Sequence, residues 1–74
     1  MSRLPVISGR EMVKILGRII FTNVGQKGSH VRMKRQRGKK VLIDIIPMQR
    51  ELAKGTLRSV LRQANMSEDL NRLL

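Results

Sequence analysis

The residue with the clearest capacity for chemistry is His30, the one histidine of the chain. Histidine gains and loses a proton near neutral pH, so a neutral imidazole can act as a general base. His30 directly follows a Gly-Ser pair and has Lys27 and Arg32 close by in the sequence. Such a base can take the proton from a ribose 2′-hydroxyl while neighbouring cations stabilise the charge that develops on the adjacent phosphate. This chemistry needs the 2′-hydroxyl and is therefore confined to RNA.

The segment around His30 is strongly basic, and residues 27–40 include no acid. From residue 30 to residue 34 the cations alternate with Val31 and Met33, which places the charges on one face of a strand. A basic stripe of this kind is typical of a phosphate-binding surface. The predicted RNA-binding residues are Lys27, Gly28, Ser29, Arg32, Lys34, Arg35 and Arg37. A simpler interpretation is a solvated hairpin whose charges keep a sheet edge soluble.

The composition of the whole chain favours a polyanionic partner over that simpler interpretation. Of its 74 residues, 16 are Lys or Arg and five are Asp or Glu, which gives a formal net charge of +11. Solubility alone does not require such an excess, whereas a nucleic acid would neutralise it. The single aromatic residue, Phe21, is expected in the core, so base stacking is not the predicted mode of binding. Recognition of a double helix through its shape and backbone fits better.

The sequence predicts neither a metal site nor a cofactor. The chain contains no cysteine and a single histidine. Two-metal nucleases need several converging carboxylates, and the five acids available are Glu11, Asp44, Glu51, Glu68 and Asp69. A nuclease built from this chain is therefore expected to be metal-independent. The absence of a membrane-span-length apolar run and of a secretory signal pattern predicts a cytoplasmic protein.

A helix and a hairpin are expected to position the basic segment. Ser8 and Glu11 have the spacing of a capping box, and apolar residues at helical spacing predict a helix over 9–18. Residues 20–26 are rich in β-branched residues and predict a first strand. A turn then leads to a second strand that begins at His30.

A third strand is predicted over residues 40–46. Its alternation suggests that Val41, Ile43 and Ile45 share the buried face while Asp44 points the other way. Pro47 is expected to end this strand.

The rest of the chain is predicted to be helical. Thr56 is available as a cap for a second helix, whose apolar stripe is formed by Leu57, Val60, Leu61 and Ala64. Ser67 can cap a short C-terminal helix within 67–74. The predicted fold class is α+β, an α-β-β-β-α domain with two helices on one face of a three-stranded antiparallel sheet. One domain accounts for residues 1–74, with an N-terminal tail over 1–8 and a helical extension over 67–74.

Two motifs at a characteristic separation carry a family resemblance. Gln26-Lys27-Gly28-Ser29-His30, then a basic hairpin, and then the stretch from Glu51 to Ala64 closely resemble the HicA family of messenger-RNA interferase toxins. The resemblance runs from about Gly9 to Ser67. It implies a double-stranded-RNA-binding-domain-like fold, a catalytic histidine at His30 and inhibition by a HicB antitoxin.

Two functions therefore remain open: an endoribonuclease toxin that depends on His30, and a non-catalytic RNA-binding module of the double-stranded-RNA-binding-domain type. A DNA-reading helix over 56–64 and a membrane-surface domain are less well supported. The expected partners are messenger RNA and an acidic HicB-like antitoxin. Its carboxylates are expected to meet Arg32, Lys34 and Arg35, with apolar contacts from the second helix.

Overall fold

The structure, a computed structural model, describes residues 6–64, and its first element is a capped helix. This helix, α1, spans Gly9–Arg18. The Ser8 hydroxyl accepts a hydrogen bond from the Glu11 N–H at 3.0 Å, and the Glu11 carboxylate accepts one from the Ser8 N–H at 3.0 Å. These two bonds form the predicted capping box and satisfy N–H groups that a helix start otherwise leaves unpaired. The helix prediction over 9–18 is confirmed.

The end of α1 is a Schellman motif built without glycine. Phe21 N–H donates to the Leu16 carbonyl at 3.0 Å, and Ile20 N–H donates to the Gly17 carbonyl at 3.3 Å. This places Ile20 in the left-handed region, at φ 69°. Because the chain is still reversing direction at residues 19–21, the first strand begins at Thr22 rather than at residue 20. Phe21 is buried in the core, as expected.

Three antiparallel strands follow in the order β1-β2-β3. They are β1 (Thr22–Lys27), β2 (His30–Arg37) and β3 (Lys40–Pro47). Each connection is a two-residue turn that starts with a glycine in the left-handed region, Gly28 at φ 58° and Gly38 at φ 61°. Glycine adopts this conformation without the Cβ penalty, which suits it to the first central position of a tight hairpin.

The second helix, α2, spans Lys54–Gln63 and begins earlier than predicted. Its N-cap is Ala53, whose side chain makes no capping hydrogen bond. Thr56 therefore lies within the first turn of α2, and the prediction that it caps the helix is wrong. The apolar stripe is as predicted, since Leu57, Val60 and Leu61 are buried. The predicted C-terminal helix, within residues 67–74, lies outside the described residues.

The prediction for β3 is wrong about which face is buried. Ile46 and Asp44 point inward, whereas Val41, Ile43 and Ile45 are exposed. The two-residue turn at Gly38 and Lys39 sets the register, in which Val31 pairs with Ile46 and Met33 with Asp44. Directly paired residues share a face of the sheet. Because Val31 and Met33 are buried, the even-numbered residues of β3 must face the core with them.

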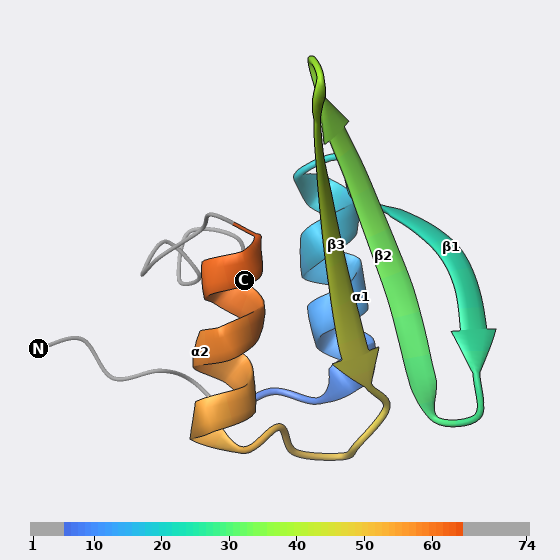
Figure 1. Cartoon of the computed structure of the whole chain (residues 1–74). Helices are drawn as coiled ribbons and strands as arrows, with labels where there is room; N and C mark the ends of the chain where they lie inside the picture. The colour runs from blue at the N-terminus through green and yellow to red at the C-terminus, as the bar shows by residue number, and fades with distance from the viewer. Residues whose placement is uncertain (1–5, 65–74) are drawn as a thin grey trace, which may run out of the picture.

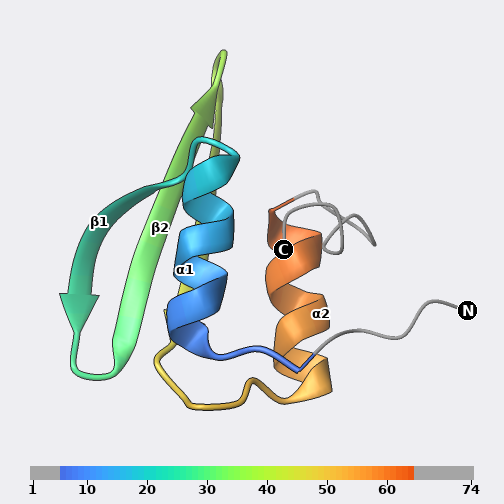
Figure 2. The ribbon, with the colours of Figure 1, turned by 180° about the vertical axis from the view of Figure 1, so that it is seen from behind.

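Both helices cover the inner face of the sheet and leave its outer face open. Figures 1 and 2 show α1 behind the strands and α2 alongside β3. α1 contacts all three strands, while α2 contacts β3. The core is made of the buried apolar residues Ile7, Met12, Ile15, Leu16, Phe21, Val31, Met33, Ile46, Leu52, Leu57, Val60, Leu61 and Ala64. The α+β prediction, with two helices and a three-stranded antiparallel sheet, is confirmed.

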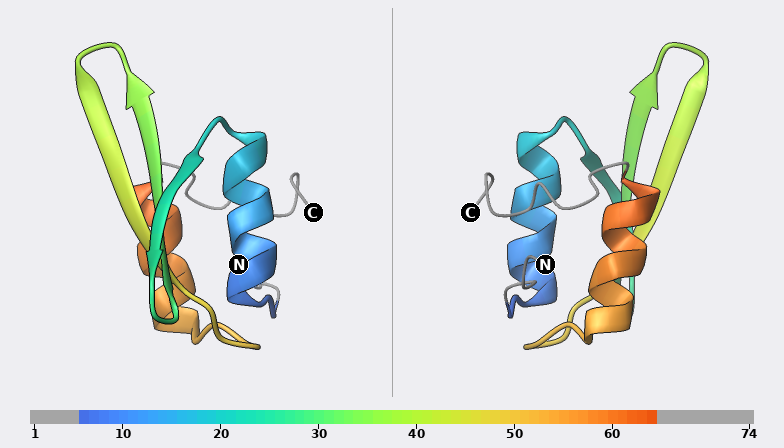
Figure 3. Two further views of the ribbon diagram at one scale, coloured as in Figure 1. Left: turned by 90° about the vertical axis from the view of Figure 1, so that its right-hand side faces the viewer. Right: turned by 90° about the vertical axis from the view of Figure 1, so that its left-hand side faces the viewer.

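The distal part of the β2–β3 hairpin projects beyond the rest of the fold. Thr22 of β1 pairs with Lys34, so residues 35–42 of the hairpin pair only with each other. Figures 1 and 3 show this two-stranded arm, residues 35–42, reaching past the helices. Neither α1 nor α2 has the length and apolar character that a membrane-spanning helix needs.

One acid is buried beneath the sheet. Asp44 is 4% exposed, and within the described residues its Oδ2 atom has no hydrogen-bond partner. Burial disfavours the charged carboxylate and raises the pKa of Asp44 to about 7, although a hydrogen bond from the Ile45 backbone lowers it in part. Asp44 faces the helices, so it lies on the opposite side of the sheet from His30.

Candidate active site

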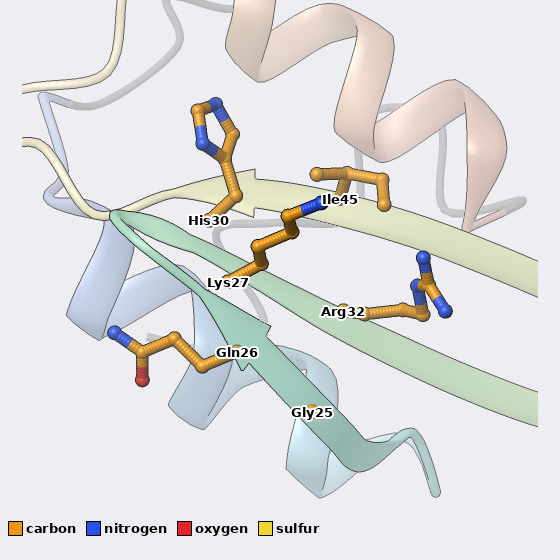
Figure 4. A pocket seen from close by; sticks show the side chains of 6 residues that line it. All are labelled: Gly25, Gln26, Lys27, His30, Arg32 and Ile45. Atoms are coloured by element: carbon orange, nitrogen blue, oxygen red, sulfur yellow. The ribbon is translucent and has the colours of Figure 1, made fainter.

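An open hollow of about 660 Å³ lies on the sheet around His30. Its lining comes from all three strands: Gly25, Gln26, Lys27, His30, Arg32 and Ile45. Figure 4 shows the Lys27 side chain extending toward Ile45, between His30 and Arg32. In the same view the Gln26 side chain points away from this group. The hollow thus brings one imidazole and two cationic side chains together on an exposed surface.

The turn before β2 determines where His30 stands. His30 is the first residue of β2 and pairs with Lys27 on one side and Pro47 on the other. The Ser29 carbonyl accepts a hydrogen bond from Met48 N–H at 2.6 Å, which fastens the turn to the segment after β3. The Gln26 side-chain amide donates to the Gly28 carbonyl at 3.1 Å. These contacts support a turn-shaping role for Gly28 and Ser29 and hold the backbone of His30 in a defined position.

The predicted RNA-binding residues divide between the two faces of the sheet. Lys27 and Arg32 line the hollow with His30. Lys34 continues on the same outer face, two residues further along β2. Arg35 and Arg37 alternate onto the other face, where they pair with Leu42 and Lys40 of the arm. The single basic surface predicted from the sequence is therefore an outer column with a separate basic arm.

Three lining residues were absent from the predicted site. Gly25 and Gln26 belong to β1, and a bulge at Val24 brings Gly25 opposite Arg32. Because Gly25 has no side chain, β1 places nothing beside Arg32 at that position. Ile45 lies opposite Arg32 on β3 and was expected in the core. The hairpin register, extended across both turns, was the sequence signal that identified Ile45 as an outer-face neighbour of the cations.

The electrostatic environment of the hollow is cationic. Three acids belong to the described residues: Glu11 caps α1, Glu51 lies in the exposed segment before α2, and Asp44 is under the sheet. None of these carboxylates lines the hollow. Across residues 6–64, no group of three or more His, Cys, Asp or Glu side chains is placed to hold a metal ion. An imidazole beside uncompensated cations suits an anionic group whose reaction needs proton transfer.

Comparison with known proteins gives one match. A family model described as the HicA toxin of bacterial toxin–antitoxin systems matches residues 9–66, which include every described helix and strand. No curated protein and no solved structure matches the chain.

Proposed function

Because the chain belongs to the HicA family of toxins from bacterial toxin–antitoxin pairs, we propose that it is a cytoplasmic, metal-independent endoribonuclease that cleaves messenger RNA. The observation that carries this proposal is the placing of His30 in an open hollow with Lys27 and Arg32. RNA-binding folds that read sequence often use aromatic platforms, whereas this hollow offers proton transfer and positive charge. The same surface is open enough to admit a polymer rather than a small enclosed ligand.

In the proposed reaction His30 acts as the general base. Its neutral imidazole takes the proton of a ribose 2′-hydroxyl, and the 2′ oxygen attacks the adjacent phosphorus. Lys27 and Arg32 stabilise the additional negative charge of the five-coordinate phosphorus. The bond from phosphorus to the 5′ oxygen then breaks, and that oxygen takes a proton from water. The products are a 2′,3′-cyclic phosphate and a free 5′-hydroxyl, so no metal and no cofactor is consumed.

The direct test is cleavage of RNA by wild type and by His30→Ala in the presence of EDTA. General acid–base catalysis contributes about 10²–10⁴-fold, so His30→Ala should lose at least about 100-fold in cleavage rate. It should keep its RNA affinity and its melting temperature, because His30 is exposed and packs little. Gln36→Ala is the matched control, since Gln36 is exposed on β2 outside the hollow.

Three results of this test would contradict the proposal. Near-wild-type cleavage by His30→Ala would remove the histidine from the mechanism. Cleavage of a substrate with a 2′-deoxy residue at the cut site would remove the 2′-hydroxyl from it. Products with 5′-phosphate ends that form only with Mg²⁺ would indicate a metal-dependent nuclease. RNA binding without any cleavage would instead support the non-catalytic RNA-binding module.

We also propose that an acidic HicB-like antitoxin inhibits the enzyme by covering the outer face of the sheet. The family pairs toxins with antitoxins, and a chain with a net charge of +11 attracts an acidic protein. The outer face holds His30 together with Arg32 and Lys34. An antitoxin bound there would exclude RNA from the same surface.

A further inference from the structure

The outer face of β3 is aliphatic, in contrast to the polar outer face of β2. Val41, Ile43 and Ile45 alternate along β3 and are 47%, 42% and 44% exposed; we term these three residues the aliphatic column. At about 3.3 Å per residue the column is about 13 Å long. The corresponding outward positions of β2 hold His30, Arg32, Lys34 and Gln36. A run of branched apolar side chains beside a run of cations is thus built into two paired strands.

Folding of the domain does not account for the aliphatic column. The inner residues of β3, such as Ile46, already contribute to the core, and the column lies on the face that α1 and α2 leave open. In addition, β3 is an edge strand of the sheet. Exposed apolar edge strands promote association, and proteins usually protect them with charges or cover them. An exposed aliphatic edge therefore points to a partner that covers it.

The register joins the aliphatic column to the basic residues of the outer face. Ile43 lies directly opposite Lys34, and Ile45 lies directly opposite Arg32. Cross-strand neighbours of this kind are about 5 Å apart. A partner that covers the column must also meet these cations. The surface is therefore composite, with a dry apolar ridge on β3 and a positive column on β2.

Three occupants can be compared by their chemistry. Phosphates gain nothing from branched aliphatic side chains, and RNA bases stack on aromatic or guanidinium planes rather than on isoleucine. A second copy would bring its own net charge of +11 against this one. An acidic protein with apolar side chains between its carboxylates satisfies both columns at once. Apolar anchors inside a polar rim are also the usual anatomy of a protein–protein interface.

We propose that the aliphatic column is the apolar anchor for the acidic antitoxin, an inference that rests on the proposed pairing but not on the catalytic mechanism. The cations beside it speed encounter, and the column retains the partner once it is bound. This replaces the expectation that the second helix supplies the apolar contacts. Leu57, Val60 and Leu61 of α2 are 1–3% exposed and are committed to the core, so they have no surface to offer.

The test separates antitoxin binding from RNA binding with one double variant. Val41→Thr combined with Ile43→Thr removes apolar area but keeps β-branched side chains, which preserves the strand. Ile45 is left unchanged because it lines the hollow. Binding of the purified cognate antitoxin is measured directly, without RNA, for the full-length toxin. The double variant should bind at least about 10-fold more weakly, with most of the change in the dissociation rate.

Matched controls make the result specific. Val6→Thr changes an exposed valine next to the segment that leads to α2, and it should leave antitoxin affinity unchanged. Ile43→Glu, which adds a charge that repels an acidic partner, should weaken binding further and guards against a small effect of the threonine pair. Melting temperatures of all variants should match wild type, since the substituted side chains are exposed.

The outcomes distinguish this inference from the proposed function. Unchanged antitoxin affinity in both the double variant and Ile43→Glu would overturn the anchor. Loss of RNA affinity in the double variant would assign the column to RNA, and a wild-type dimer that the double variant disrupts would assign it to a second copy; either result would overturn the proposal. A wild-type protein that binds antitoxin through the column but does not cleave RNA would contradict only the ribonuclease assignment.

Discussion

At the scale of single residues, the site depends on charge placed beside a proton acceptor. Lys27 is the cross-strand neighbour of His30, and its side chain lies in the same hollow. Arg32 is two residues beyond His30 on the same face of β2. Both side chains are exposed and need no rearrangement to reach a bound phosphate.

Lys27→Gln should therefore lower the cleavage rate more than it lowers RNA affinity, because the ammonium acts on charge that develops in the transition state. We expect a decrease of about 10²-fold in kcat, by analogy with the loss of one charge-stabilising donor. Lys27→Arg keeps the charge and should restore most of the rate. Single-turnover kinetics together with RNA binding to each variant would check this, and equal losses from the two substitutions would contradict a charge-based role.

Asp44 makes the stability of the domain depend on pH. Its folded-state pKa is raised from 3.8 to about 7 by burial, so the folded chain holds a proton that the unfolded chain releases between these values. The free energy of unfolding should therefore be highest near pH 4 and fall as pH rises toward 7, with the full penalty present above pH 7. Met33 lies opposite Asp44, and the nearest cation on that face by register is Arg35.

Asp44→Asn should remove this dependence, because asparagine is isosteric with the protonated acid and carries no charge. We expect the variant to be more stable than wild type by about 1 kcal/mol or more at pH 8, and by less at pH 5. Denaturant unfolding at both pH values would measure the difference. Glu51→Gln is the control for loss of an exposed acid, and a stability gain of the same size there would contradict the burial argument.

At the scale of elements, α1 is held against the end of β3 by a close backbone approach. Gly9 is buried, and its N–H donates to the Gln49 carbonyl at 2.9 Å. A Cβ at this position would overlap the Pro47 carbonyl oxygen and lie 2.9 Å from the Met48 Cα. Both neighbours are backbone atoms that cannot move independently. The start of α1 and the segment that carries the Ser29 contact are therefore packed as one unit.

Gly9→Ala should consequently destabilise the domain by about 1–3 kcal/mol, the usual cost of forcing extra volume into a packed site. Gly17→Ala is the opposite case, because Gly17 lies inside α1 and a Cβ there meets nothing within 4 Å. It should stabilise the domain by about 0.5–1 kcal/mol through helix propensity. Thermal unfolding of the two variants should shift in opposite directions, and shifts of the same sign would show that local space does not decide the outcome.

The basic arm should extend the contact with RNA away from the cleavage point. Arg37 is seven residues beyond His30, a distance of about 23 Å at 3.3 Å per residue. Arg37→Gln with Lys39→Gln and Lys40→Gln should weaken binding of a 20-nucleotide RNA and reduce its salt dependence by up to about 0.7–0.9 per lost phosphate contact. Cleavage of a four-nucleotide substrate, which is too short to reach the arm, should change little. Equal effects on the two substrates would show that the arm does not bind RNA.

At the scale of the whole molecule, a net charge of +11 acts on every anionic partner. It raises encounter rates with RNA and with an acidic antitoxin alike, and salt screens both. The division of the cations between two faces means that the partners need not use the same residues. Arg32 and Lys34 lie on the outer face, whereas Arg35 lies on the inner one.

Arg32→Glu should therefore slow association with the antitoxin more than Arg35→Glu does, although both change the net charge by the same amount. The difference should shrink at high ionic strength, because steering by exposed charges is screened. Association rates at two salt concentrations would measure it. The antitoxin should also displace RNA from His30→Ala toxin. Simultaneous binding of RNA and antitoxin, or equal effects of the two arginine substitutions, would contradict a shared outer face.

Much of this protein follows from local sequence. Ser8 and Glu11 define the start of α1 because a capping box is a contact within four residues. The position of His30 after the turn follows from Gly28, which accepts the left-handed conformation of a tight hairpin. The basic character of the surface is a matter of composition. These features depend on neighbours in the chain, so the sequence alone was sufficient to predict them.

Only the tertiary structure decided which residues meet. Aliphatic side chains occupy both alternating sets of β3, so its pattern could not show whether Ile43 or Ile46 is buried. The register with β2 settled the question, since Val31 and Met33 already face the core and their partners must do the same. That one-residue choice buried Asp44, exposed the aliphatic column beside the cations, and sent Arg35 to the opposite face. Side-chain alternation in a strand has a period of two, so a parity set by a distant strand governs every residue of β3 at once.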